Sequence, residues 1–113
     1  MNIKRVYDPV EETDGYRILV DRLWPRGLSK AKAQIDLWLK SAAPSNDLRK
    51  SFGHDPERFA EFSKRYLEEL TATGALDELR AAIKAHPNAT LLYAAHDEEH
   101  NNAVVLKELL LKK

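Results

Sequence analysis

Residues 89–95 read Ala-Thr-Leu-Leu-Tyr-Ala-Ala, a nearly continuous apolar run with the length of one strand. A half-exposed strand alternates apolar and polar residues, whereas a strand that is covered on both faces is apolar throughout. Strands of the second kind occur in parallel sheets that carry helices on each side. The run therefore predicts an α/β fold in three layers, with a small, mostly parallel sheet flanked by helices.

Two further strands are predicted near the N-terminus, at residues 3–7 and 16–20. Both are short and rich in β-branched and aromatic side chains, and a polar, turn-forming stretch separates them. The short connection permits a hairpin, and it also permits a parallel pair with another strand between the two. The strand order therefore stays open.

A first helix is predicted after the second strand. Ser29 is a suitable N-cap, and apolar residues at positions 35, 38, 39 and 42 recur at helical spacing before Pro44. A short helical turn is expected to begin at Ser45 or Asn46 and to run through Phe52.

The second half of the chain shows clearer helix signals. Asp55 followed by Pro56 is a strong start signal, and Gly74 is a typical stop for the helix that follows. Apolar spacing predicts another helix through residues 76–83 that ends at 86–88, and a last helix at 104–111.

The composition is that of one globular domain spanning residues 1–113, with 43% hydrophobic residues to fill a single core. The absence of cysteine excludes disulfides, thiolate nucleophiles and iron–sulfur clusters. The N-terminal residues have no apolar signal core, and no apolar run is long enough to span a membrane. We therefore expect a cytoplasmic protein without a membrane partner.

The charge is balanced overall, with 18 Lys and Arg against 18 Asp and Glu, which argues against a general nucleic-acid binder. Residues 17–50 depart from this balance, because they hold eight basic and three acidic side chains, a net charge of +5. This one-sided excess next to two tryptophans indicates an anionic partner. A small anionic ligand is the expected partner, and nucleic acid is less favoured.

The segment after the second predicted strand, residues 21–27, reads Asp-Arg-Leu-Trp-Pro-Arg-Gly. Parallel sheets bind ligands beyond the carboxyl ends of their strands, which is where this segment is expected. Arg22 and Arg26 flank a stiff Trp-Pro pair and could bind phosphate or carboxylate in a bidentate way, while Trp24 could stack on a flat ligand. The structural alternative is that Asp21 pairs with an arginine and Trp24 packs in the core.

The segment after the last predicted strand, residues 96–102, reads His-Asp-Glu-Glu-His-Asn-Asn. It leads into a helix N-terminus, whose free amides favour an anion. Asn101 and Asn102 contact a ligand in one interpretation and cap the helix in the other. His96 and His100 have the spacing of a zinc-binding pair, but that chemistry needs both on one face of a formed helix, so no metal ligand is assigned.

Candidate site residues follow from these segments and from the basic excess. The candidate proton carriers for catalysis are His54, Asp21 and Asp97, although a histidine placed like His54 is more often an exposed loop residue. The candidate ligand contacts are Arg22, Trp24, Arg26, Trp38, Lys40, Arg49, Tyr93, His96, Asn101 and Asn102. No motif identifies a reaction, so enzymatic activity, cofactor and oligomeric state stay open.

A set of short motifs resembles the YeaO-like branch of the domain-of-unknown-function 488 family. The motifs are residues 21–27, Trp-Leu-Lys at 38–40, Ala-Pro-Ser at 43–45, Leu-Arg at 48–49, His-Asp-Pro at 54–56, Thr-Leu-Leu-Tyr-Ala-Ala at 90–95, and His-Asn-x-Ala at 100–103. The resemblance covers nearly the whole chain and implies a compact Rossmann-like α/β domain, but it brings no established reaction. It also implies a site shared by Arg22, Arg26 and the last loop, in which His96 stands where Lys or Arg is usual.

Three hypotheses on function follow. The leading one is a pocket at the strand carboxyl ends for a small anionic, nucleotide- or nucleobase-like ligand. The alternative is a non-enzymatic module that docks its basic segment on a protein or a nucleic acid. A concave site that contains both Trp24 and Trp38 would favour the first, and a flat basic face the second. The third is a metal-dependent hydrolase, for which His96, His100 and a carboxylate would have to converge.

Overall fold

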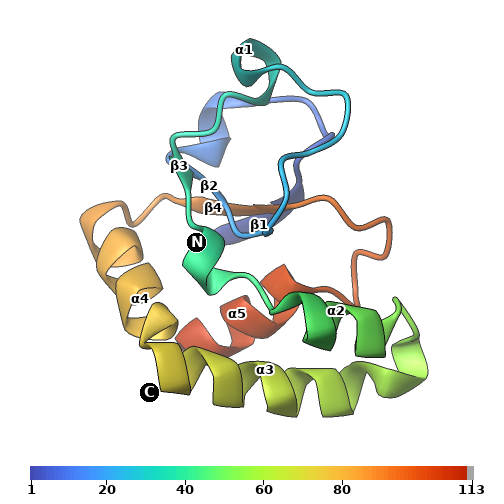
Figure 1. Cartoon of the computed structure of the whole chain (residues 1–113). Coiled ribbons are helices and arrows are strands. Elements are labelled where there is room, and N and C mark those ends of the chain that lie inside the picture. The colour runs from blue at the N-terminus through green and yellow to red at the C-terminus, as the bar shows by residue number, and fades with distance from the viewer. Residues whose placement is uncertain (112–113) are drawn as a thin grey trace.

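A four-stranded sheet forms the centre of the computed structural model, which describes residues 1–111 (Figure 1). Its strands are β1 (Asn2–Arg5), β2 (Arg17–Leu19), β3 (Leu37–Trp38) and β4 (Thr90–Tyr93), in the order β1-β4-β2-β3. Every neighbouring pair is parallel. The predicted α/β fold with a parallel sheet is confirmed, and the open question of strand order is answered, because β4 lies between β1 and β2.

Strand β4 is buried on both faces, as its apolar sequence predicts. All four of its residues are buried, and it pairs with β1 on one side and with β2 on the other. Ile18 and Leu91 belong to one apolar cluster, while Leu19 and Leu92 belong to a second. Because successive strand residues point to opposite faces, these two clusters are the two covered sides of the sheet.

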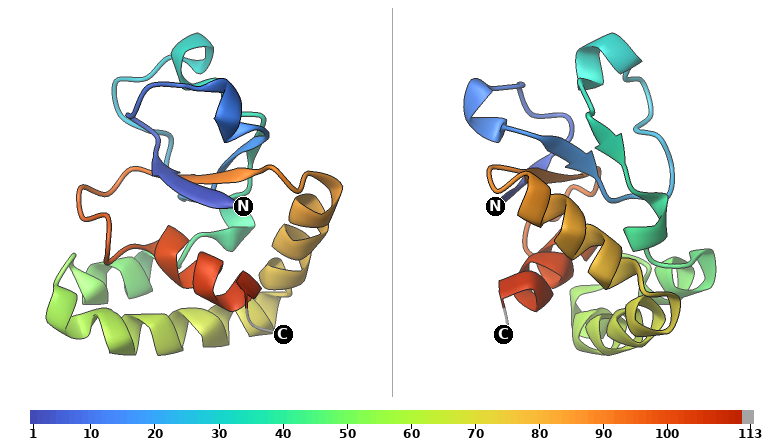
Figure 2. Two further views of the ribbon diagram at one scale, coloured as in Figure 1. Left: turned by 180° about the vertical axis from the view of Figure 1, so that it is seen from behind. Right: turned by 90° about the vertical axis from the view of Figure 1, so that its left-hand side faces the viewer.

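The four longer helices cover one face of the sheet (Figure 2). They are α2 (Asn46–Phe52), α3 (Phe59–Thr73), α4 (Ala75–Ala85) and α5 (Asn102–Leu111). Three short 3₁₀ helices, η1 (Glu12–Asp14), η2 (Lys40–Ala42) and η3 (Pro56–Arg58), lie in the connections. The long helices pack around buried residues such as Phe62 and Leu106, and this cluster is the main core.

The opposite face is covered by a thinner layer. Val6, Leu19 and Leu92 lie beneath side chains of residues 24–38, the segment that carries the short helix α1 (Lys30–Ala33). This layer places the loop after β2 above the sheet, and so it sets the position of residues 21–27.

The helix predicted from Ser29 to Pro44 is wrong beyond its first turn. Ser29 does cap α1, accepting a hydrogen bond from the Lys32 amide, but α1 ends at Ala33 and Gln34 adopts a left-handed conformation with φ of 46°. Residues 37–38 instead form β3. The reason is pairing with β2, because the amides of Asp36 and Leu39 donate to the carbonyls of Arg17 and Leu19 at 2.9 Å.

The other predicted helix boundaries agree well with the structure. Ser45 caps α2 through the Leu48 amide, and Asp55 accepts from the Glu57 amide ahead of η3 and α3. Gly74 ends α3 with φ of 74°, which a residue without Cβ adopts without strain. Within residues 1–111, no helix has the length and apolar character that crossing a membrane requires.

Candidate functional site

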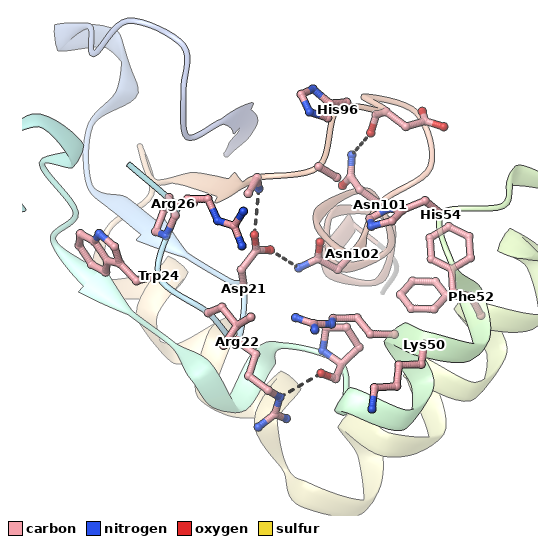
Figure 3. A pocket seen from close by; sticks show the side chains of 18 of the residues that line it. Asp21, Arg22, Trp24, Arg26, Lys50, Phe52, His54, His96, Asn101 and Asn102 are labelled. Carbon is pink, nitrogen blue, oxygen red and sulfur yellow. Dashed lines mark hydrogen bonds between the residues drawn. The ribbon is translucent and has the colours of Figure 1, made fainter. Parts of the chain in front are cut away.

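A pocket of about 760 Å³ opens at the carboxyl ends of β2 and β4 (Figure 3). Most of the lining comes from three parts of the chain: the loop after β2, the C-terminal half of α2 with the turn that follows, and the loop between β4 and α5 with the first residue of α5. The lining residues are Tyr7, Asp21, Arg22, Leu23, Trp24, Pro25, Arg26, Pro44, Arg49, Lys50, Phe52, His54, Phe62, Ala94, Ala95, His96, Asp97, Asn101 and Asn102. The pocket lies where parallel sheets place their ligands.

Ten of the candidate site residues come together in this lining. They are Asp21, Arg22, Trp24, Arg26, Arg49, His54, His96, Asp97, Asn101 and Asn102. Trp38, Lys40 and Tyr93 lie elsewhere. Tyr93 is buried in the main core, while the Lys40 ammonium sits over the Trp38 ring at 4.0 Å.

The two tryptophans mainly serve packing. Each indole N–H donates to a backbone carbonyl, that of Trp24 to Leu28 at 2.7 Å and that of Trp38 to Asp21 at 2.8 Å. Their rings meet edge to face at 5.4 Å between centroids, within the cluster on the second face of the sheet. Of the two, only Trp24 contributes surface to the pocket. Because its ring packs in this cluster and its N–H is already paired, a role in the core describes Trp24 better than stacking on a ligand.

Arginine side chains without a protein partner gather at the pocket. Of the eight arginines, all within the described residues 1–111, six donate a side-chain hydrogen bond. The guanidinium groups of Arg26 and Arg49 make neither a hydrogen bond nor a salt bridge there, and both line the pocket. Arg22 donates only Nε, to the Pro44 carbonyl at 3.3 Å, which leaves its terminal nitrogens free within the same residues. Three guanidinium groups thus have hydrogen-bonding capacity to offer a ligand.

Asp21 is held by neutral donors rather than by an arginine, so the predicted structural pairing with an arginine is wrong. One carboxylate oxygen accepts from the Ala94 amide at 2.9 Å and the other from the Asn102 side-chain amide at 3.0 Å. Burial raises the pKa of Asp21, while these two donors and the nearby charges of Arg49 and His54 partly oppose that rise. The carboxylate also ties the end of β2 to the end of β4 and to the start of α5.

The two asparagines have different roles. Asn101 is buried and caps the last helix, since its side-chain oxygen accepts from the Val104 amide at 3.0 Å and its amide donates to the Asp97 carbonyl. The Asn102 amide bridges the Val20 carbonyl and the Asp21 carboxylate. The capping interpretation therefore accounts for Asn101, and Asn102 positions Asp21.

The remaining candidates lie around the rim. Asp97 accepts from the amides of Glu99 and His100 and from the His100 ring at 2.9 Å. The Glu99 amide is the largest cause that lowers the pKa of Asp97, and the His100 ring adds to it. His96 contacts Arg5 instead, at 3.5 Å. Among residues 1–111, no three His, Cys, Asp or Glu side chains converge as metal ligands, which leaves the metal-hydrolase hypothesis without support from the geometry.

His54 is held in a strained backbone conformation with φ of 57°. Residues with a Cβ seldom adopt this left-handed region, and such outliers cluster at binding sites. Gly53 directly before it is also left-handed, so the chain reverses sharply after α2 and brings the His54 side chain to the pocket (Figure 3).

Several lining residues were not predicted from the sequence. Phe52 and Phe62 stack with 4.4 Å between ring centroids and form an apolar wall, and Lys50 adds a further cation beside Arg49. Both aromatic residues follow helical spacing and so read as core residues. Lys50 could have been found from its place next to Arg49 in the basic segment.

Replacing Asn102 with alanine is expected to lower the free energy of unfolding by about 1–3 kcal/mol at pH 7, because its bonds to Val20 and to the Asp21 carboxylate are lost. The loss of the amide also raises the folded-state pKa of Asp21 further above its unfolded value. The resulting penalty is absent below the unfolded pKa and grows as the pH rises through the folded one. Urea unfolding at pH 4 and pH 7 measures both effects.

The exposed Asn46, at the first position of α2, provides the control for that experiment. Asn46→Ala is expected to change stability by less than about 0.5 kcal/mol at either pH. An equal cost of Asn102→Ala at the two pH values would show that Asn102 does not stabilise the charge on Asp21.

Fold and site together define an α/β protein with a parallel sheet and a basic pocket at the strand carboxyl ends. The chain belongs to the YeaO-like proteins of the DUF488 family, and the family model described as "Inactive DUF488-N3 subclade" matches residues 1–113. The resemblance inferred from the sequence motifs is therefore confirmed.

Two of the proteins that the chain is similar to carry the description "uncharacterized protein". The chain is 46% identical over 112 residues to the uncharacterized protein YeaO of Escherichia coli, with 97% of each chain covered. It is 41% identical over 110 residues to the uncharacterized protein Rv3073c of Mycobacterium tuberculosis, with 97% of this chain and 92% of the relative covered. No solved structure matches the chain.

Proposed function

We propose that the chain binds a small anionic, nucleotide-like molecule in the pocket at the carboxyl ends of β2 and β4. The observation that carries this proposal is the placement of Arg26 and Arg49. Their guanidinium groups have no protein partner within residues 1–111, while each of the other six arginines donates at least one side-chain hydrogen bond. Guanidinium groups are well suited to phosphate and carboxylate, which they bind through paired hydrogen bonds.

The size and lining of the pocket favour an organic anion over a bare inorganic ion. A volume of about 760 Å³ lies within the usual range of small-molecule sites. Phe52, Phe62 and Ala94 supply apolar surface, while the cations stand around it. A molecule with a flat apolar part and an anionic group, such as a nucleotide, matches both features.

The contacts of the candidate proton carriers fit a binding role better than a catalytic one. The Asp97 carboxylate is engaged by its own turn, and the Asp21 carboxylate holds Ala94 and Asn102 in place. The family model is described as an inactive subclade, which agrees with a binding role. His54 is the remaining candidate acid or base, and in this proposal it contributes to ligand contact.

The alternative, docking of the basic segment on a macromolecule, is less well supported. Arg22, Arg26 and Arg49 line a concave pocket rather than a flat face. Arg17, which adds to the basic excess in the sequence, is 3% exposed and paired with Asp14. The excess of positive charge that is available to a flat docking surface is therefore smaller than the net charge of residues 17–50 indicates.

The test is a thermal-unfolding series with inorganic phosphate, sulfate and nucleoside monophosphates. A ligand at 100 times its dissociation constant stabilises the folded state by about 2.7 kcal/mol, which corresponds to on the order of 10 °C for a domain of this size. We expect such a rise for the wild type and its loss in the double variant Arg26→Ala/Arg49→Ala.

A matched control removes two positive charges outside the pocket lining. Lys64 on α3 and Lys84 on α4 are exposed and do not line the pocket, so Lys64→Ala/Lys84→Ala should keep the ligand response. An equal loss in both double variants would indicate a general charge effect. The absence of a rise with any anion would overturn the proposal and shift the weight to a macromolecular partner.

A further inference from the structure

The pocket holds one acidic group among its cations, and this group has acceptor capacity to spare. A carboxylate has about four lone-pair sites, two on each oxygen. Asp21 uses one on each oxygen, for the Ala94 amide and for the Asn102 side-chain amide. Within residues 1–111, no other hydrogen bond or salt bridge reaches this carboxylate, so each oxygen keeps one free site.

Asp21 lines the pocket beside the start of α5, so its remaining acceptor sites are available to a ligand bound there (Figure 3). Its position is fixed from both sides by β4 and by Asn102. A fixed carboxylate with one free site on each oxygen accepts two parallel hydrogen bonds from two adjacent N–H donors.

The Watson–Crick edge of guanine presents such a pair, the ring N1–H and the exocyclic 2-amino group. Hypoxanthine keeps only the N1–H, and adenine has an amino group beside a ring acceptor. A carboxylate at this position therefore favours guanine, since a site built for a donor leaves its own buried groups unpaired with an analogue that lacks it.

We propose that the pocket selects a guanine nucleotide, with the base edge on the Asp21 carboxylate and the phosphate among Arg22, Arg26 and Arg49. This inference rests on the proposed function and narrows its ligand class. Phe52 and Phe62 provide the apolar wall along the base. The acceptor and two of the cations, Arg22 and Arg26, come from the loop after β2, and the third cation comes from α2.

The experiment compares guanosine, inosine and adenosine 5′-monophosphates by isothermal titration calorimetry on the wild-type protein. The three share ribose and phosphate and differ only in the base edge. We expect guanosine monophosphate to bind at least about tenfold more tightly than the other two, the size of one well-placed bidentate contact. The wild-type comparison needs no substitution, so a folding defect cannot obscure it.

The variant Asp21→Asn adds an independent test. An asparagine offers one acceptor and one donor, so the preference for guanosine over inosine monophosphate should fall to about twofold or less, with thermal unfolding as the check that the variant is folded. Arg26→Ala should weaken all three nucleotides alike and leave their order unchanged.

The outcomes separate the two proposals. If the three nucleotides bound with equal affinity and Arg26→Ala weakened all of them, the choice of guanine would be overturned. The proposed anion pocket would still be supported. Undetectable binding of all three nucleotides would overturn the choice of guanine. The proposed anion pocket would then depend on whether another anion binds in a way that requires Arg26 and Arg49. A guanosine preference that persists in Asp21→Asn would remove Asp21 from base recognition.

Discussion

Replacing Asp14 with asparagine is expected to lower the free energy of unfolding by about 3–5 kcal/mol, because the change leaves a buried arginine without its counter-charge. Asp14 and Arg17 have side chains that are 6% and 3% exposed and meet at 2.5 Å. Lys4 on β1 contacts the same carboxylate at 3.0 Å. Chemical unfolding at pH 7 measures the loss.

The pH dependence gives this prediction a second readout. Burial alone would raise the pKa of Asp14, but the Glu11 amide and the Lys4 and Arg17 charges outweigh it and lower the pKa. A carboxyl with a lowered folded-state pKa stabilises the fold above its unfolded pKa and loses that contribution as the pH falls. The difference between the wild type and Asp14→Asn should therefore shrink in acid.

The matched control is the exposed ion pair of Asp77 and Arg80, which are 87% and 48% exposed and lie 3.8 Å apart. Asp77→Asn removes the same charge from a solvated site and should cost no more than about 1 kcal/mol. Similar costs for the two substitutions would contradict the role of burial at Asp14.

The second large effect is expected at Gly15, where alanine should destabilise the protein by roughly 2–5 kcal/mol. Gly15 has φ of 63° and ψ of −134°, a region that residues with a Cβ avoid. A Cβ at this position would lie 2.2 Å from the Asn88 carbonyl oxygen, which is backbone and cannot swing aside. Thermal and urea unfolding measure the change.

Gly74 provides the comparison that separates backbone strain from this clash. It also has a positive φ, 74°, but a Cβ there would meet nothing within 4 Å. Gly74→Ala should cost only about 1–2 kcal/mol, the price of the left-handed conformation. If the two variants lost the same free energy of unfolding, the predicted contribution of the clash with Asn88 would be contradicted.

The parts of the fold that were predictable are those where local signals and tertiary contacts agree. The buried character of β4 followed from its apolar run, and Ser45, Asp55 and Gly74 marked helix ends that the structure keeps. Strand β3 escaped prediction because two residues are too short for a periodic signal. Its apolar neighbours also fit a helix until pairing with β2 is known.

The sequence placed most of the candidate residues around one pocket, but it did not give the contacts that they make there. The rule that ligands lie beyond strand carboxyl ends predicted that the segments of Arg22 and Asn102 lie together, and both line the same pocket. Lys40 and Trp38 do not line this pocket, and the helix to which they were assigned is replaced by β3 and η2. The partners of Asp21 depend on the position of β4 beside β2, which sequence spacing does not encode.

The most direct test of the anion pocket is a titration of the uniformly ¹⁵N-labelled protein with inorganic phosphate, followed through the backbone amide resonances. Saturable shifts are predicted for residues 21–26, 49–54 and 94–102, the three segments that form most of the pocket lining. The same shifts should be absent in Arg26→Ala/Arg49→Ala. Shifts confined to the amides near other basic residues, such as Arg58 in η3 and Arg65 on α3, would contradict an anion site between β2 and β4, as would the absence of any saturable shift.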